Sequence, residues 1–239
     1  MPRLDGRNPE DLRPIKITPG FQSYAEGSVL IEQGKTQVIV SVTMEDRVPP
    51  FLKNSGSGWV TAEYAMLPRA TSTRTPRDSA GKISGRSQEI QRLVGRSLRA
   101  VTDLATLGER SFTVDCDVLQ ADAGTRTASI TGGYVALYLA FNKLHRLGVL
   151  KSMPLKSQVA AVSVSIYKGN ILLDPAYDED CNADSDFNLV MNSKGEFIEV
   201  QGTAEKKAYS RESLDMVLAT AEKGIRQLFE IQMAAVKGI

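Results

Sequence analysis

The sequence predicts an α+β fold, in which strands and helices are interspersed without strict alternation. Two observations support this prediction. Several short runs alternate apolar and polar residues, as half-buried strands do, and three longer segments repeat apolar residues at spacings of three and four, as amphipathic helices do. With 239 residues, 42% of them hydrophobic, the chain can bury a sizeable core in one large domain or two small ones.

The expected strands occur in both halves of the chain. Alternation is strongest at residues 37–44, where every second residue is Val or Met and would lie on one buried face of a strand. The same pattern extends over residues 15–46. Further strand-like runs cover residues 58–66, 112–119, 158–167, 170–173, 188–192 and 197–201.

Three segments have the periodicity of helices. They cover residues 87–107, residues 127–147 and a stretch that begins near Ser210, whose hydroxyl suits a helix N-cap. Gly132 and Gly133 interrupt the second segment and indicate close packing or a bend. A break is expected at residues 148–156, because a glycine and then a proline follow that helix.

Composition argues against several classes of protein. The net charge is +1, so overall charge does not point to a nucleic-acid partner. The two cysteines have no metal-binding spacing and indicate reduced thiols. The first residues are polar, and the densest apolar run is far shorter than a membrane span. We therefore expect a cytoplasmic protein without membrane contact.

The charges are nevertheless segregated along the chain. Residues 68–99 carry eight basic side chains, seven of them arginine, against two acidic ones, a local charge of +6. Arginine suits bidentate contact with phosphate, so this basic block favours RNA or phosphate over the alternative of a solvated helix face. Its members are Arg69, Arg74, Arg77, Lys82, Arg86, Arg92, Arg96 and Arg99.

Gly124, Thr125 and Arg126 indicate an anion site, because they follow an expected strand and open an expected helix. Free N–H groups and the helix dipole attract anions at a helix N-terminus. Glycine permits close approach, threonine adds a hydroxyl donor and arginine adds charge. Taken alone, the fragment fits a plain glycine turn with an N-cap threonine equally well.

An acidic block follows in the second half. Residues 174–186 contain six carboxylates and no basic residue, with Asp180 and Asp186 in a loop-like stretch. Clustered carboxylates repel one another unless a proton or cation intervenes, and hard oxygen ligands suit Mg²⁺ or Mn²⁺. An acidic surface loop is the alternative. The single histidine, His145, lies late in an expected helix and gives little support to a Ser-His-Asp or Cys-His mechanism.

The chain resembles the ribonuclease PH family in motifs spread over nearly its whole length. The matching stretches are Arg3-Leu-Asp-Gly-Arg7, Arg13-Pro14 and residues 63–69, 85–99, 115–132 and 200–205. The resemblance implies the ribonuclease PH fold, with two related βαβα-type halves packed together. The first, residues 1–147, would hold the phosphate turn and the RNA-binding arginines. The second, residues 157–239, would hold the acidic metal site and a C-terminal helix.

The resemblance also implies an activity. Family members are phosphorolytic 3′→5′ exoribonucleases, phosphate-dependent tRNA nucleotidyltransferases that trim tRNA precursors and other RNA and release nucleoside diphosphates. Inorganic phosphate is the co-substrate, Mg²⁺ or Mn²⁺ the cofactor, and the assembly a homo-hexamer, a trimer of dimers. The implied phosphate site is Arg86, Gly124, Thr125 and Arg126, and the implied catalytic acids and metal ligands are Asp180 and Asp186. The implied RNA-binding residues are Arg69, Arg74 and Arg77, with Arg92, Arg96 and Arg99 as further candidates.

The chain departs from the family pattern at three places. Pro175 and Ala176 replace a leucine and a polar or acidic residue, which removes a carboxylate near the metal. Cys181 replaces a serine beside Asp180, and residues 206–210 replace a more apolar run.

Two alternatives belong to other functional classes. One is a non-catalytic RNA-binding subunit of an exosome-like ring. Such relatives typically lose part of the phosphate turn or of the acidic pair, and this chain keeps both. The other is a metal-dependent hydrolytic nuclease, which needs no phosphate pocket and releases monophosphates in place of diphosphates.

Overall fold

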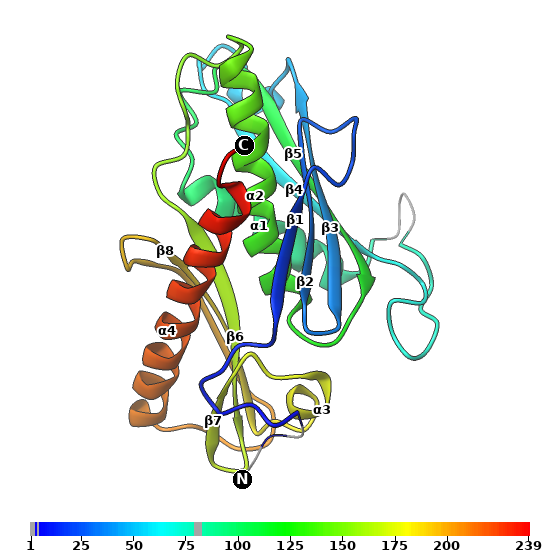
Figure 1. Ribbon diagram of the computed structural model, residues 1–239, viewed down its shortest axis with the longest axis vertical. Coiled ribbons are helices and arrows are strands. Elements are labelled where there is room, and N and C mark those ends of the chain that lie inside the picture. The colour runs from blue at the N-terminus through cyan, green and yellow to red at the C-terminus, as the bar shows by residue number, and fades with distance from the viewer. Residues whose placement is uncertain (1–2, 4, 79–82) are drawn as a thin grey trace.

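The computed structural model describes residues 3, 5–78 and 83–239 of the chain. A five-stranded sheet and a four-stranded sheet form the two main layers (Figure 1). The long helix α2 (Thr125–Arg146) packs against both sheets, and the helix α4 (Arg211–Val236) covers the smaller one. This arrangement confirms the predicted α+β class. Within the described residues, no helix combines the length and apolarity needed to cross a membrane.

The larger sheet has the strand order β1-β2-β3-β5-β4. Its strands are β1 (Ile15–Pro19), β2 (Gly27–Gln33), β3 (Thr36–Glu45), β4 (Trp59–Met66) and β5 (Ser111–Gln120), and a short 3-10 helix, η1 (Pro50–Leu52), precedes β4. Neighbouring strands are antiparallel except β4 and β5, which are parallel and are joined through the helix α1 (Gly85–Ala100). Both parallel strands therefore end at the same edge of the sheet, and the functional loops begin there.

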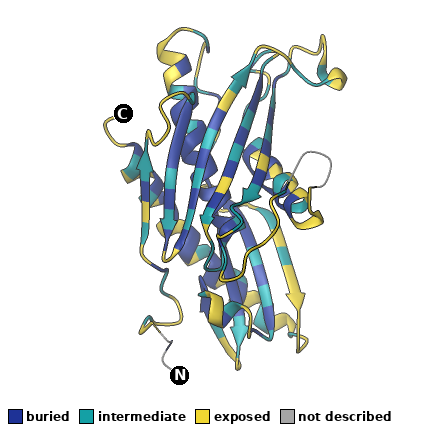
Figure 2. Ribbon diagram, turned by 90° about the vertical axis from the view of Figure 1, so that its right-hand side faces the viewer, coloured by how far each residue is buried: buried dark blue, intermediate teal, exposed yellow. Residues whose placement is uncertain are grey.

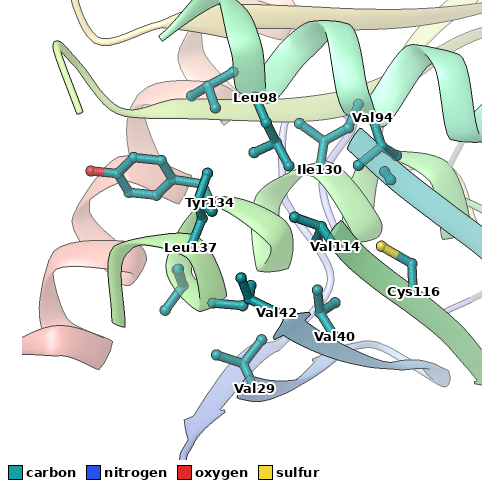
Figure 3. Packing of buried hydrophobic residues seen from close by; sticks show 14 of the residues in the cluster. Val29, Val40, Val42, Val94, Leu98, Val114, Cys116, Ile130, Tyr134 and Leu137 are labelled. Atoms are coloured by element: carbon teal, nitrogen blue, oxygen red, sulfur yellow. The ribbon is translucent and has the colours of Figure 1, made fainter. Parts of the chain in front are cut away.

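One apolar cluster joins this sheet to α1 and α2 (Figure 3). Val38, Val40 and Val42 alternate along β3, and each is fully buried. Glycine in α2 allows the close approach that the sequence indicates: a Cβ atom at Gly132 would lie only 2.9 Å from Cγ2 of Ile31. The helix therefore packs tightly against the sheet, and its N-terminus is held firmly at the edge where β5 ends.

The smaller sheet is antiparallel throughout, with the order β7-β6-β8-β9. Its strands are β6 (Val159–Tyr167), β7 (Asn170–Leu173), β8 (Ser185–Asn192) and β9 (Phe197–Ala204). One face packs against α4 in a second apolar cluster, and the other contributes residues to the first cluster beneath α2. Buried residues accordingly run through the interior of both layers, and exposed ones lie on the loops and outer edges (Figure 2).

Two local expectations are wrong. The helix expected at residues 87–107 ends at Ala100, because the chain beyond it pairs with the segment at 154–156: Asp103 N–H donates to the Pro154 carbonyl at 2.7 Å. The acidic block, expected as a loop, contains a single helical turn, α3 (Tyr177–Asp180). The other expected strands and helices occur within a few residues of their predicted bounds.

Candidate functional site

The segment between β5 and α2 lies at the edge of the larger sheet where β4 and β5 end. Ala123 and Gly124 both have left-handed backbone, with φ of 59° and 66°, which reverses the chain between strand and helix. The Thr36 hydroxyl donates to the Ala123 carbonyl at 2.7 Å and accepts from the Asp122 N–H at 2.9 Å. N–H groups in the first turn of a helix have no partner within the helix, so this segment suits an anion. We call residues 121–126 the Gly124 turn.

Tyr64 of β4 lies beneath the Gly124 turn and is almost fully buried. Its hydroxyl shares a hydrogen bond of 2.8 Å with the hydroxyl of Thr125. Burial raises the pKa of Tyr64, and this hydrogen bond and the positive charges of Arg86 and Arg126 oppose the rise. The charges of both arginines therefore act on the buried residues beside the start of α2.

Arg126 links elements from both sheets. Its Nη1 lies 3.4 Å from a carboxylate oxygen of Glu89 on α1 and donates to Oε1 of Gln201 on β9 at 3.2 Å. Gln201 Nε2 donates in turn to Glu89 at 3.2 Å. This small network holds the Arg126 guanidinium where α1, α2 and β9 meet. Arg86 is exposed in the first turn of α1, whose N-terminus is capped by the Ser84 hydroxyl.

The two predicted catalytic acids lie close together on the smaller half. Asp180 ends α3 and Asp186 lies in β8. They line an open pocket of about 330 Å³ together with Cys181, Ala183, Glu205 and Lys206. Burial and then the charge of Asp186 raise the pKa of Asp180, and burial and then the charge of Glu205 raise the pKa of Asp186. Both carboxylates therefore favour a proton or a cation nearby.

Arginines outside the smaller sheet act electrostatically on Asp180 and Asp186. Arg86, Arg13 and Arg126 oppose the burial-driven rise in the pKa of Asp180, and Arg126 does the same for Asp186. The predicted anion site also touches the element that carries Asp180, because the Tyr177 N–H at the start of α3 donates to Asp122 of the Gly124 turn at 3.2 Å.

A divalent cation fits this pair of acids. Mg²⁺ usually takes one or two carboxylates and completes its octahedron with water and substrate phosphate oxygens. Ser165, which pairs with Asp186 across strands β6 and β8, has a buried hydroxyl without a partner among the described residues. Across the described parts of the chain, no group of three or more His, Cys, Asp or Glu has the geometry of a metal site. The protein therefore offers an open two-carboxylate site, and no closed cage is found.

The predicted RNA-binding arginines fall into two groups. Arg69, Arg74 and Arg77 are exposed on the segment that leaves β4 at the same edge as the Gly124 turn, and their role in RNA binding stays a prediction. Lys82 of the basic block lies outside the described residues. Arg92 is exposed on α1.

Arg96 and Arg99 of α1 have intramolecular partners. Arg96 Nη2 lies 2.9 and 3.0 Å from the carboxylate oxygens of Glu199 on β9. Arg99 Nη1 donates to the Val60 carbonyl at 2.7 Å, and its guanidinium lies 4.2 Å from the centre of the Trp59 ring. These contacts tie α1 to its neighbours, and a role in RNA binding for the two arginines stays a prediction.

Four side chains that build the site received no role in the sequence prediction: Tyr64, Arg13, Gln201 and Asp174. The first three lie within motifs shared with the ribonuclease PH family, and this shared sequence is the one feature that could have identified them as site residues. Asp174 counted only as a member of the acidic block. Their contacts depend on strand register and on chain segments far apart in sequence, and residue spacing carries no information about either.

Comparison with known proteins identifies the family. The models of the 3′ exoribonuclease family match residues 11–141 for domain 1 and residues 157–224 for domain 2. Two solved structures share the fold. Rice Rrp46 has a TM-score of 0.80 and 20% identity, over 98% of this chain and 100% of that one. An Archaeoglobus fulgidus exosome with RNA bound to the active site has a TM-score of 0.82 and 24% identity, over 96% of this chain and 92% of that one.

Curated relatives are much closer in sequence. Ribonuclease PH of Dehalococcoides mccartyi is 75% identical over 233 residues, which cover 97% of this chain and 97% of the relative. Ribonuclease PH of Syntrophomonas wolfei is 56% identical over 97% of this chain and 98% of its own. Since both domain models match in order and these relatives align over almost their whole length, the chain belongs to the 3′ exoribonuclease family, in the branch that contains ribonuclease PH.

Proposed function

We propose that the chain shortens RNA from its 3′ end by phosphorolysis, in which inorganic phosphate attacks the phosphorus of the terminal phosphodiester, displaces the 3′ oxygen of the shortened RNA and so forms a nucleoside diphosphate. The observation that carries the proposal is the contact between the Gly124 turn and α3, where the Tyr177 N–H donates to a carboxylate oxygen of Asp122 at 3.2 Å. It places the turn and Arg126 beside the pocket that Asp180 and Asp186 line, and the charges of Arg86 and Arg126 act on Asp180. One side of the site offers positive charge and N–H donors to an anion, and the other offers carboxylates. A nuclease that used water would have no need of the first side.

Phosphate would be held by the larger half. The first N–H groups of α2, the Thr125 hydroxyl and the guanidinium groups of Arg86 and Arg126 would bind the anion and fix it in line with the scissile phosphorus. Such positioning, together with neutralisation of charge, accounts for most of the catalysis in phosphoryl transfer.

Asp180 and Asp186 would stabilise and protonate the departing 3′ oxygen. Mg²⁺ or Mn²⁺ bound by Asp180 and Asp186 would supply positive charge beside the phosphoryl oxygens. The raised pKa of Asp180, caused by burial and by Asp186, supports its assignment as the proton donor to the departing 3′ oxygen. A carboxylate that coordinates a metal is deprotonated, so Asp186 would hold the cation while Asp180 carries the proton for the 3′ oxygen, and Asp180 would bind the cation only in its deprotonated form.

RNA would be gripped by arginines near the site. Arg69, Arg74 and Arg77 are exposed at the edge of the sheet where the Gly124 turn also lies, and arginine forms bidentate contacts with backbone phosphates. The natural substrates we propose are tRNA precursors, together with rRNA and other RNA, because a single-stranded 3′ extension can enter an open pocket. Binding through these arginines would weaken with rising salt.

We also propose that the protein works in the cytoplasm as a homo-hexamer, a trimer of dimers. The support is the similarity to ribonuclease PH along the chain. Light scattering tests the assembly, because each chain contributes 26.0 kDa to the mass of the particle.

The decisive experiment supplies the purified protein with Mg²⁺ and a 3′-extended tRNA precursor, with and without inorganic phosphate. Trimming that requires phosphate and releases nucleoside diphosphates is the expected result. Release of monophosphates without phosphate would identify a hydrolase. RNA binding without release of any nucleotide would identify a non-catalytic ring subunit.

A further inference from the structure

Arg13 lies between the two halves of the site. It precedes β1 at the end of residues 5–14, which we call the N-terminal arm and which cross to the smaller sheet near β7 and α3 (Figure 1). The side chain is 3% exposed. Its guanidinium is therefore withheld from substrate, and the surrounding contacts decide what it does.

On the side of the acids, Arg13 is bound to Asp174, which follows β7 and is fully buried. Oδ2 of Asp174 accepts from the Arg13 backbone N–H at 2.8 Å and from Nε at 3.0 Å, and Oδ1 accepts from Nη2 at 2.6 Å. Gln33 Nε2 donates to the same Oδ1 at 2.7 Å. Four donors thus satisfy this carboxylate, which begins the segment leading to Asp180.

On the side of the phosphate site, Arg13 touches the Gly124 turn directly. Its Nη1 donates to the Asp122 carbonyl. A Cβ atom at Gly124 would lie 3.0 Å from Nη2 of Arg13 and 3.9 Å from Oδ1 of Asp174, so glycine is what lets the turn rest against this pair. One guanidinium therefore contacts both the turn that would bind phosphate and the segment that holds the acids.

We propose that Arg13 and Asp174 form a clamp that sets the position of the bound phosphate relative to Asp180 and Asp186. Arg13 and Asp174 are positioning residues in this proposal, because neither reaches the substrate. The inference rests on the proposed phosphate and acid sites. Lysine cannot replace Arg13, since its single ammonium cannot reach the Asp122 carbonyl while it also makes the bidentate contact with Asp174.

The clamp is tested by steady-state kinetics of Arg13→Lys, Asp174→Asn and the double variant, with phosphate and RNA varied separately. The two single variants are expected to lower kcat about 10- to 100-fold, with KM for phosphate changed by less than about threefold, because misplacement by 1 Å mainly affects the transition state. The double variant is expected to lose no more than the worse single variant, since both remove the same contact.

Three controls separate the clamp from general instability and from failure of the site assignment. Leu144→Ala leaves a cavity at the C-terminal end of α2, the opposite end of this helix from the Gly124 turn, and is expected to lower Tm with kcat and KM unchanged. Arg110→Lys weakens an exposed pair with Asp46 and is expected to be neutral. Arg126→Ala removes a proposed phosphate ligand, so normal trimming by this variant would refute the site itself.

The clamp proposal is overturned if Arg126→Ala is inactive but Arg13→Lys and Asp174→Asn both fold and keep kcat within about twofold of the unchanged enzyme. If neither variant folds, Gln33→Met provides the milder test, because it removes one of the four donors to Asp174 and leaves Arg13 in place. A fall in kcat with Tm retained supports the clamp in that variant, and an unchanged kcat refutes it.

Discussion

The hydroxyl groups of Tyr64 and Thr125 share a hydrogen bond of 2.8 Å, and this bond joins strand β4 to the first residue of α2. It fixes the rotamer of a side chain that we assign to the phosphate site. The bond is buried, so solvent does not compete with it.

We expect Tyr64→Phe to raise KM for phosphate about 2- to 10-fold, the range that corresponds to one net hydrogen bond. The ring still fills its place in the core, so Tm is expected to change little. Phosphate-dependent trimming at varied phosphate measures the effect. Tyr134→Phe is the matched control, because Tyr134 is also a buried tyrosine but lies about two and a half turns beyond Thr125 along α2. An equal change in both variants would contradict the role given to Tyr64.

Arg126→Ala is expected to lower phosphate-dependent trimming at least about 100-fold, because it removes a fixed positive charge where negative charge is transferred. RNA affinity, measured by filter binding, is expected to stay largely intact, since Arg69, Arg74 and Arg77 supply the proposed backbone contacts. Normal trimming by the variant would show that Arg126 is no phosphate ligand. Arg146→Ala, an exposed change at the far end of α2, is expected to have no effect.

The pH dependence of the reaction depends on the charges around Asp186. Burial and the charge of Glu205 raise the pKa of Asp186, and a metal ligand must be deprotonated to bind. Neutralising Glu205 with Glu205→Gln lowers this pKa, so the acidic limb of the kcat/KM profile is expected to move to lower pH. Glu230→Gln, on the exposed face of α4, is the control. Superimposable acidic limbs for Glu205→Gln and the unchanged enzyme would show that Glu205 does not influence the ligand.

Asp115 on β5 makes stability depend on pH. Burial, followed by the charges of Glu63 and Asp117, raises its pKa from 3.8 to about 6. The stability linked to its protonated form is fully present below pH 3.8 and is lost as the pH rises through about 6. We expect Asp115→Asn to raise Tm at pH 8 by about 2–4 °C for each kcal/mol gained, and to leave it unchanged at pH 3.5. Calorimetry at the two pH values measures the difference. A gain of equal size at both would exclude ionisation as the cause.

Much of the fold could be predicted because its signals are local. Alternating valines predict β3, and Ser210 predicts the start of α4, since each pattern reflects the burial or capping of that element alone. The end of α1 could not be predicted, because residues near 102 pair with residues near 155 and this pairing overrides a helical pattern. The turn α3 was missed because its stability comes from distant contacts, such as the buried pair of Glu179 with Arg3.

The residues of the site likewise fall into those that local sequence predicts and those that depend on distant contacts. The Gly124 turn could be located from three adjacent residues between a strand and a helix. The clamp could not, because Arg13 and Asp174 are far apart in sequence and only the packing of the two sheets brings them together. The role of Tyr64 could not be predicted for a similar reason, since its contact with Thr125 depends on the parallel register of β4 beside β5.

The distance along the chain between Arg13 and Asp174, 161 residues, has a consequence for synthesis. A ribosome adding about 5–20 residues per second needs on the order of ten to thirty seconds to cover it. During that time the Arg13 guanidinium lacks its partner carboxylate, because Asp174 has not yet been synthesised. The contact that ties the segment before β1 to the segment after β7 can therefore form only once the ribosome has added Asp174.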